Sequence, residues 1–298
     1  MHVVIAGASG FLGSHLGREL DARGHEVTRL VRRPAAGSDE SQWDPYAGQV
    51  DQDLVGSADV VVNLAGTPTA GNPHSRRWAD QLMSSRVVST RVLAEAIAAA
   101  GGAPAFLAGN GISFYGDHGS EVLTETSESR GDALLTRVTR AWQEATTAAL
   151  DAGARVCVLR TSPVYDRASA PLKQLAPLFR LGLGARLGDG RQFAPVISLR
   201  DWVAAVAFLA ESPSVSGPVN LCCPVVPTNA ELTSALATAL HRPALLRAPA
   251  FVLRPAAGAM APELLGSMRA RPQVLLDAGF DFRDTDIGDV LAAGLQRS

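Results

Sequence analysis

The sequence is nearly without lysine. Lysine and arginine together number 27, yet Lys173 is the one lysine in the chain. Tyrosine is also scarce, and occurs at Tyr46, Tyr115 and Tyr165. A tyrosine and a lysine four residues apart on a helix lie on the same face, where the charge of the lysine lowers the pKa of the tyrosine and lets the pair transfer protons. The sequence contains no Tyr-x-x-x-Lys, so proton transfer by that pair is excluded.

Cysteine, charge excess and long apolar runs are lacking too. Cys157, Cys222 and Cys223 are an odd number with two adjacent, which argues against a disulfide framework and for buried thiols in a reducing compartment. The formal net charge of -2 argues against a nucleic-acid binder. The sequence has no signal peptide and no run of about 18 apolar residues, so we expect a soluble cytoplasmic protein that does not bind a membrane.

Motifs for metal binding and for a serine nucleophile are missing as well. No two histidines stand three or four positions apart, and no G-x-S-x-G occurs. The histidines are His2, His15, His25, His74, His118 and His241. We therefore expect no metal site.

What the sequence does contain is a regular alternation of strands and helices. Apolar runs predict strands at 2–6, 25–31, 58–66, 104–110, 154–162 and 217–223. Helical patterns lie between them, with the longest at 78–100 and 132–152, and others at 200–212, 228–240 and 261–270. This order predicts an α/β fold with a doubly wound parallel sheet of the Rossmann type.

The alternation also predicts how the chain is divided. Residues 1–164 should form the dinucleotide-binding Rossmann domain, with its sheet completed by about 217–223. Residues 165–298 should mainly form a smaller substrate-binding lobe over the carboxyl ends of the strands.

A glycine-rich turn follows the first strand. Gly7, Gly10 and Gly13 give G-x-x-G-x-x-G, and they suit a tight turn, close approach to a pyrophosphate, and close packing of helix on strand. The following helix offers free N–H groups and its positive end to the phosphates. The predicted cofactor contacts of this segment are Gly7, Ser9, Gly10, Phe11, Leu12 and Gly13.

The end of the second strand indicates which dinucleotide binds. An NAD site usually places an acid there, whereas this chain reads LVRRP, with Arg32 and Arg33. Two guanidinium groups suit the 2′-phosphate of NADP(H). We therefore expect NADP(H) rather than NAD(H).

These motifs resemble a known group, the epimerase-like branch of the extended and atypical short-chain dehydrogenase/reductase superfamily. The resemblance rests on GASGFLGSHL (7–16), VVNLAG (61–66), SRVVSTRVLAEAI (85–97) and the C-terminal RPQVLLDAGFDF (271–282), and it spans almost the whole chain. It implies an NADP(H) site that includes Leu64, Ala65 and Gly66 after the third strand. It also implies that Asn110, Arg160 and Pro163 face the nicotinamide half.

The same resemblance shows where the chemistry departs from the superfamily. Most of its reductases and epimerases use serine, tyrosine and lysine, but here Trp142 stands near the lysine position and Val138 near that of the tyrosine. The helical apolar stripe that contains Trp142 favours a packing role for it. The candidate catalytic residues are Tyr115 as the proton donor, with Asn110 and Ser113 at the end of the fourth strand of the predicted sheet.

Three functions remain open from the sequence. The first is an NADP(H)-dependent oxidoreductase or epimerase acting on a small carbonyl or alcohol. The second is a non-redox cyclase, dehydratase or isomerase that uses the fold as a shaped pocket. The third is a catalytically silent NADP(H) sensor. The expected partner is a small-molecule substrate and not a nucleic acid, and a homodimer is one assembly left open.

Overall fold

A computed structural model of the chain describes residues 1–296 and has a central sheet of seven parallel strands. The strand order is β11-β7-β5-β4-β1-β2-β3, which confirms the predicted doubly wound topology. Their bounds are β1 (His2–Ala6), β2 (Glu26–Val31), β3 (Glu40–Gln42), β4 (Val60–Asn63), β5 (Ala105–Gly111), β7 (Val156–Thr161) and β11 (Gly217–Leu221). The predicted segment 217–223 does complete the sheet, while the short edge strand β3 lacks a clear apolar pattern and was not expected.

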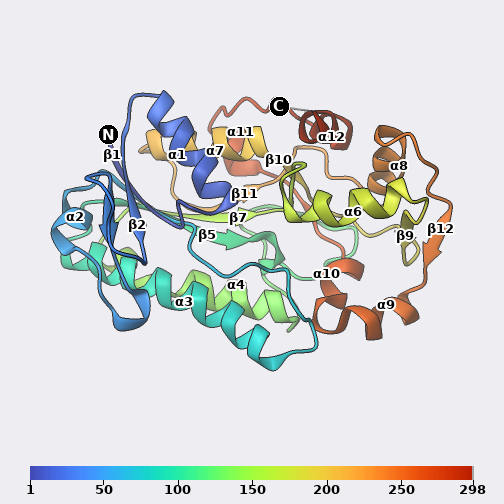
Figure 1. The fold of residues 1–298 in the computed structure, drawn as a ribbon, viewed down its shortest axis with the longest axis horizontal. Helices are drawn as coiled ribbons and strands as arrows, with labels where there is room; N and C mark the ends of the chain where they lie inside the picture. The colour runs from blue at the N-terminus through green and yellow to red at the C-terminus, as the bar shows by residue number, and fades with distance from the viewer. Residues whose placement is uncertain (297–298) are drawn as a thin grey trace.

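Helices cover both faces of the sheet (Figure 1). One face carries α1 (Phe11–Ala22), α7 (Leu199–Glu211) and α11 (Gln273–Asp277), and the other carries α2 (Gln52–Ser57), α3 (Arg76–Ala99), α4 (Leu134–Glu144) and α5 (Thr147–Asp151). Successive side chains of β1 point to opposite faces of the sheet, so this strand contributes to the hydrophobic core on each face. Val3 and Ile5 pack under α1, while Val4 and Ala6 pack on the opposite face. Among the described residues, no helix has the length and apolar character that a membrane span needs.

The smaller lobe lies beyond the carboxyl ends of the strands, at the right of Figure 1. Its elements are β8 (Val164–Tyr165), α6 (Ala170–Arg180), β9 (Ala185–Leu187), β10 (Ile197–Ser198), α8 (Asn229–Ala239), β12 (Leu246–Ala248), α9 (Ala250–Ala257), α10 (Ala261–Leu265) and α12 (Ile287–Leu295). Parallel pairing joins β8 to β10 and β9 to β12, so segments far apart in the sequence hold this lobe together.

Two predicted helices are shorter than expected. The helix predicted at 261–270 ends at Leu265, because Gly266 is extended with φ -73° and ψ 158°. The residues after it form β13 (Arg269–Ala270), which pairs with β6 (Val122–Leu123). The helix predicted at 132–152 divides into α4 and α5.

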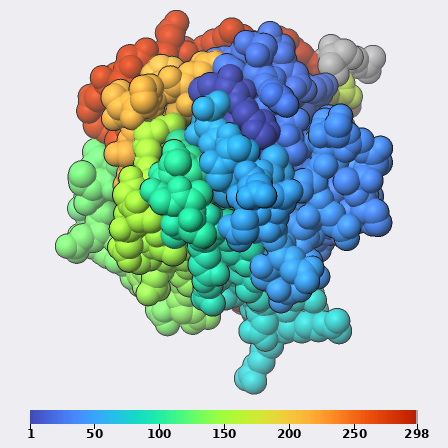
Figure 2. Space-filling view, turned by 90° about the vertical axis from the view of Figure 1, so that its left-hand side faces the viewer, coloured from blue at the N-terminus to red at the C-terminus, as the bar shows by residue number. Residues whose placement is uncertain are grey.

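The segment before α12 contacts the Rossmann domain. The carboxylate of Asp201, on α7, accepts the backbone N–H groups of Arg283 and Asp284 at 3.1 and 2.8 Å. Figure 2 shows the end of the molecule opposite the small lobe, where orange and red segments lie against the blue N-terminal ones. The two halves of the chain therefore share one body.

Candidate cofactor and active site

The glycine-rich turn between β1 and α1 forms a tight backbone cradle. Gly7 has φ 83°, and its carbonyl accepts the Gly10 N–H at 3.0 Å. A Cβ on Gly7 would lie 2.6 Å from the carbonyl carbon of Leu64, and one on Gly13 would lie 2.3 Å from the Gly7 oxygen. No side chain caps α1, which begins at Phe11. The backbone N–H groups at the N-terminus of this helix therefore donate to no capping side chain. The residues present fit a dinucleotide diphosphate.

The end of β4 adjoins this turn. Leu64 and Ala65 are partly exposed and lie beside Gly7, while Gly66 is exposed and lies against the Arg86 side chain. The buried Asn63 fixes them, because its Oδ1 accepts the Ala65 N–H at 3.0 Å. Two neighbouring strand ends thus meet where the sequence predicts a cofactor.

The two arginines after β2 differ in their surroundings. Arg33 donates both of its terminal nitrogens to the Glu40 carboxylate, at 2.7 and 2.6 Å. The hydrogen bonds from Arg33 hold the pKa of Glu40 down at about 2, so this acid is charged at neutral pH. Arg32 is exposed and makes no hydrogen bond or ion pair to residues 1–296. Arg32 is therefore the freer of the two predicted phosphate ligands.

A half-buried cation lies beside Trp142. The guanidinium of Arg86 lies 5.1 Å from the centre of the Trp142 ring and donates to the Thr67 carbonyl at 3.0 Å. Trp142 in turn donates from Nε1 to the Thr90 hydroxyl at 2.8 Å. Burial lowers the pKa of Arg86 to about 10, so it stays positively charged at neutral pH. Arg86 lies within the helix predicted at 78–100, and no pattern in the sequence marked it as a site residue.

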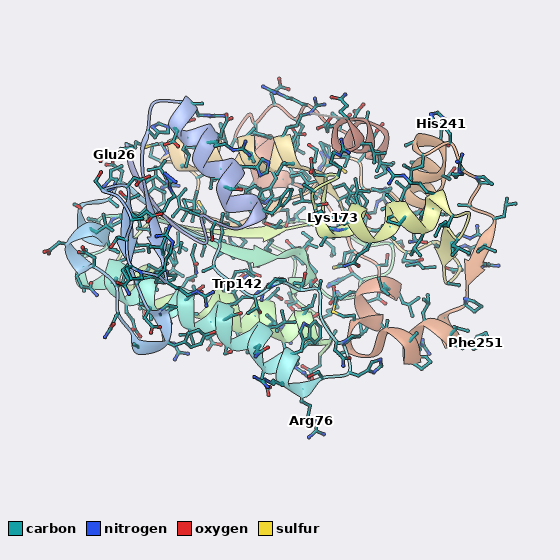
Figure 3. All side chains as sticks on the ribbon, viewed as in Figure 1. Glu26, Arg76, Trp142, Lys173, His241 and Phe251 are labelled. Carbon is teal, nitrogen blue, oxygen red and sulfur yellow. The ribbon has the colours of Figure 1, made fainter. Side chains whose placement is uncertain are left out.

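The only lysine lies elsewhere. Lys173 is exposed on α6, whereas Trp142 lies on α4 beneath the sheet (Figure 3). Lys173 therefore cannot take the place of the missing partner.

The structure does not support the predicted catalytic role of Tyr115. Its side chain exposes 0% of its surface, and its hydroxyl donates to Asn220 Oδ1 at 2.7 Å while accepting from Arg160 Nη1 at 2.9 Å. Burial raises the pKa of Tyr115 to about 12. A hydroxyl enclosed in this way does not reach a substrate in the cleft.

Arg160 belongs to the same buried group and is not placed to touch a cofactor. It exposes 2% of its surface, donates to Gln143 Oε1 at 3.0 Å, and stacks 3.6 Å from the centre of the Phe114 ring. It also donates to the Glu125 carbonyl at 3.2 Å. We assign this cluster to holding β7, α4 and the segment after β5 together. By contrast, the nearby Pro163 is exposed, as its prediction as a cofactor contact requires.

Asn110 is likewise turned inward. Its Nδ2 donates to the Thr139 carbonyl at 3.1 Å, and its Oδ1 accepts the Gly111 N–H at 2.7 Å. Only 4% of its surface is exposed, so its amide ties β5 to α4 and does not face a substrate carbonyl. The structure therefore does not support the roles predicted for it in catalysis and cofactor binding.

Ser113 is the remaining catalytic candidate, and it has a partner that the sequence did not suggest. It lies in the 3-10 turn η2 (Ile112–Phe114) that follows β5. Its Oγ donates to Glu263 Oε2, on α10, at 2.6 Å. Glu263 stands 150 positions further along the chain, so no local pattern could have paired the two.

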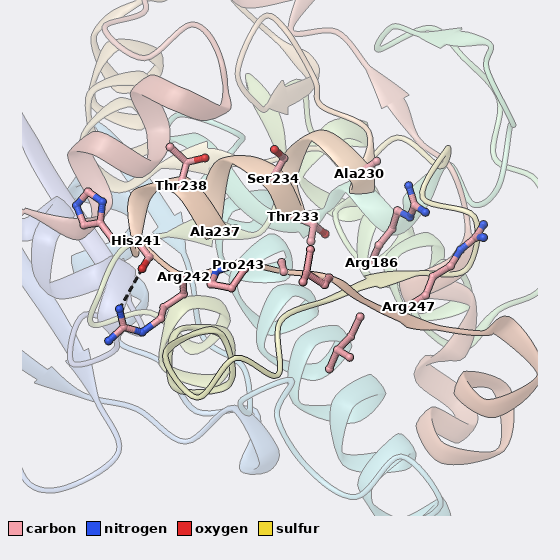
Figure 4. A pocket seen from close by; sticks show the side chains of 13 residues that line it. Arg186, Ala230, Thr233, Ser234, Ala237, Thr238, His241, Arg242, Pro243 and Arg247 are labelled. Atoms are coloured by element: carbon pink, nitrogen blue, oxygen red, sulfur yellow. Dashed lines mark hydrogen bonds between the residues drawn. The ribbon is translucent and has the colours of Figure 1, made fainter.

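Two surface pockets occur in the small lobe, away from these strand ends. The larger, of about 710 Å³, lies between α8 and β12, with Arg186 and Arg247 at one end (Figure 4). The smaller, of about 490 Å³, includes Gln192, Arg254 and Leu265. Neither pocket is lined by residues of the glycine turn or of the β4 and β5 ends, so neither coincides with the predicted cofactor contacts.

Known family patterns match most of the chain. Residues 3–222 match the NAD dependent epimerase/dehydratase family, and residues 248–293 match a domain of unknown function, DUF1731. An epimerase family protein of Mycobacterium bovis is 41% identical over 296 residues, which cover 99% of this chain and 98% of the relative. The human epimerase family protein SDR39U1 is 32% identical over 98% of both chains.

Solved structures agree with these relatives. The crystal structure of human SDR39U1 with NADPH superposes with a TM-score of 0.87 at 30% identity, covering 98% of both chains. A nucleoside-diphosphate sugar epimerase from Corynebacterium glutamicum superposes with a TM-score of 0.79 at 32% identity, covering 99% of this chain and 58% of that one.

Proposed function

Because this chain belongs to the NAD dependent epimerase/dehydratase family, in the atypical branch of the short-chain dehydrogenases, we propose that it is an NADP(H)-dependent oxidoreductase or epimerase for a small carbonyl or alcohol substrate. The observation that carries the proposal is the glycine cradle. A Cβ on Gly7 would lie 2.6 Å from a backbone atom, and one on Gly13 would lie 2.3 Å from a backbone atom. Glycine at both positions therefore lets the backbone pack this closely at the N-terminus of α1. A diphosphate is the ligand such a turn suits.

The chain's own residues have distinct duties in this proposal. The glycine turn and the N-terminus of α1 would hold the diphosphate, and Arg32 would meet the 2′-phosphate. Leu64, Ala65 and Gly66 would form the wall beside the dinucleotide. When bound, the cofactor supplies or accepts a hydride. The positive charge of Arg86 beside Trp142 would stabilise negative charge near it, as the lysine does in the usual site.

NADPH oxidation with a panel of ketones and enones tests this function. We expect turnover of at least one carbonyl class, measured as loss of nicotinamide absorbance, with none when the carbonyl is left out. NADPH binding without turnover of any member of the panel would contradict it.

One observation favours a second candidate, a non-redox isomerase or dehydratase. Tyr115 is enclosed and Lys173 lies on α6, so the proton relay of the usual reductase is missing. A reaction that persists after the protein has been stripped of dinucleotide would support this candidate, and an absolute requirement for NADPH turnover would exclude it.

The choice between NADPH and NADH can be tested at Arg32. We expect Arg32→Ala to weaken NADPH binding by about tenfold or more, the loss expected for a charge-assisted hydrogen bond to phosphate, and to leave NADH binding nearly unchanged. Glu40→Gln should do the opposite and strengthen NADPH binding, because it releases Arg33 and removes a negative charge near the phosphate. Fluorescence titration of both dinucleotides measures the ratio. The assignment is wrong if Arg32→Ala and Arg33→Ala both leave that ratio as it is in the wild type.

A further inference from the structure

The carboxyl group of Glu263 is the feature of the strand ends that the proposed function leaves unused. Glu263 lies on α10, within the segment that matches the domain of unknown function. Its Oε2 accepts the Ser113 hydroxyl at 2.6 Å. The pair thus joins the small lobe to the end of β5, between the ends of β4 and β7 in the sheet.

No cation compensates this carboxyl within residues 1–296. The nine ion pairs of the described chain leave Glu263 out, whereas the fully buried Asp284 is paired with Arg200. Burial raises the pKa of Glu263 above its usual range, and the hydrogen bond from Ser113 opposes this. A half-buried carboxyl without a cation costs stability, so its presence beside the strand ends favours a function other than stabilising the fold.

We propose that Glu263 and Ser113 form the proton-transfer pair of this active site. The inference rests on the proposed function, and names the groups that would donate the proton in place of the missing tyrosine. Ser113 Oγ would touch the substrate oxygen, and Glu263 would be the proton reservoir behind it. The DUF1731 segment would thereby complete the active site of the Rossmann domain.

The proton and electron balance of the reduction is as follows. The carbonyl carbon gains a hydride from the reduced dinucleotide, which is thereby oxidised, and the π pair moves to the carbonyl oxygen. Ser113 gives its hydroxyl proton to that oxygen and takes the proton of the Glu263 carboxyl. The Glu263 carboxylate is reprotonated from water. In the structure Ser113 donates its hydroxyl hydrogen to Glu263 Oε2. This is the arrangement in which Oε2 carries no proton.

The location of the pair can be tested without turnover by Ser113→Cys. The three native cysteines each expose 0% of their surface and Ser113 exposes 9%, so the introduced thiol should be the one that iodoacetamide reaches first. We expect alkylation of one thiol in the folded protein, slowed several-fold by saturating NADPH. Adding Glu263→Gln should lower the thiol pKa in the pH–rate profile by about one unit, because a neighbouring negative charge is removed. A thiol that resists alkylation, or whose alkylation ignores NADPH, overturns the proposal.

Turnover provides the second test. With any carbonyl that the wild type reduces, Glu263→Gln should lower kcat by about 100-fold with little change in KM. Activity of the wild type should fall as pH rises through the raised pKa of Glu263, and this limb should vanish in Glu263→Gln and persist in Glu263→Asp. Glu128→Gln, at an exposed carboxyl, is the matched control and should leave kcat unchanged.

The outcomes distinguish failure of the proton-transfer pair from failure of the oxidoreductase function. An active wild type whose kcat survives Glu263→Gln overturns the proton-transfer pair and leaves the oxidoreductase function standing. A wild type that reduces no carbonyl, although the thiol at position 113 is alkylated and protected by NADPH, overturns the oxidoreductase function and supports the placing of Ser113 at the cofactor.

Discussion

Replacing Gly13 with alanine is expected to lower the free energy of unfolding by about 3 kcal/mol and to abolish NADPH binding. The added Cβ would lie 2.3 Å from the Gly7 oxygen and 2.8 Å from the Ala8 Cα. Both are backbone atoms of the tight turn, so neither can move aside as a flexible side chain would. Relief of the clash would separate α1 from β1 and would open the cradle in which the diphosphate should lie. Urea unfolding and a fluorescence titration with NADPH measure the two effects.

Gly17 provides a control on the same helix. A Cβ there meets nothing within 4 Å, so Gly17→Ala should stabilise the protein by about 0.5–1 kcal/mol through helix propensity alone. NADPH binding should not change. If Gly13→Ala behaved like Gly17→Ala, the close contact of α1 with the turn would be contradicted.

Arg160→Met is expected to destabilise the protein by about 3 kcal/mol. The substitution keeps an apolar stem but removes the guanidinium that donates to Tyr115 and Gln143 and stacks on Phe114. The Gln143 oxygen and the Glu125 carbonyl would lose a buried donor, and unpaired buried acceptors are costly. Chemical denaturation of the variant measures the loss. Wild-type stability in Arg160→Met would mean that the cluster does not hold these elements together.

Tyr115→Phe completes a double-mutant cycle with this variant. On its own it should cost about 1–2 kcal/mol, because Asn220 loses its buried donor. The double variant should cost at least about 0.5 kcal/mol less than the sum, since both side chains serve one hydrogen-bonded group. The kcat of Tyr115→Phe should equal that of the wild type, and a large fall in kcat would restore Tyr115 as a proton donor.

The cofactor half of the site could be predicted because its signals are local. Gly7, Gly10 and Gly13 lie within one turn, directly after an apolar strand. A Cβ at each of them would lie close to backbone atoms. The parallel sheet covered on both faces also follows from the alternation of strands and helices. Such features depend on neighbours in sequence, so a single sequence suffices to find them.

The catalytic half depends on contacts between distant segments. Tyr115 and Ser113 are two residues apart, and no pattern shows which of them faces the cleft. Asn220 and Arg160, from β11 and β7, enclose the tyrosine hydroxyl, while Glu263 from α10 meets the serine. The partner of Ser113 therefore becomes visible only when α10 is placed against the end of β5.

The late position of β11 in the chain has a consequence for biosynthesis. During translation β7 emerges with one edge unpaired, and its neighbour β11 follows only after α6, α7 and the strands between them. A nascent chain in that state offers bare N–H and C=O groups and an uncovered apolar face, the combination that promotes association between incomplete chains. The packing of α11 against β11 then covers this edge of the sheet. Ribosomes that stall before it would release chains that need chaperones to stay in solution.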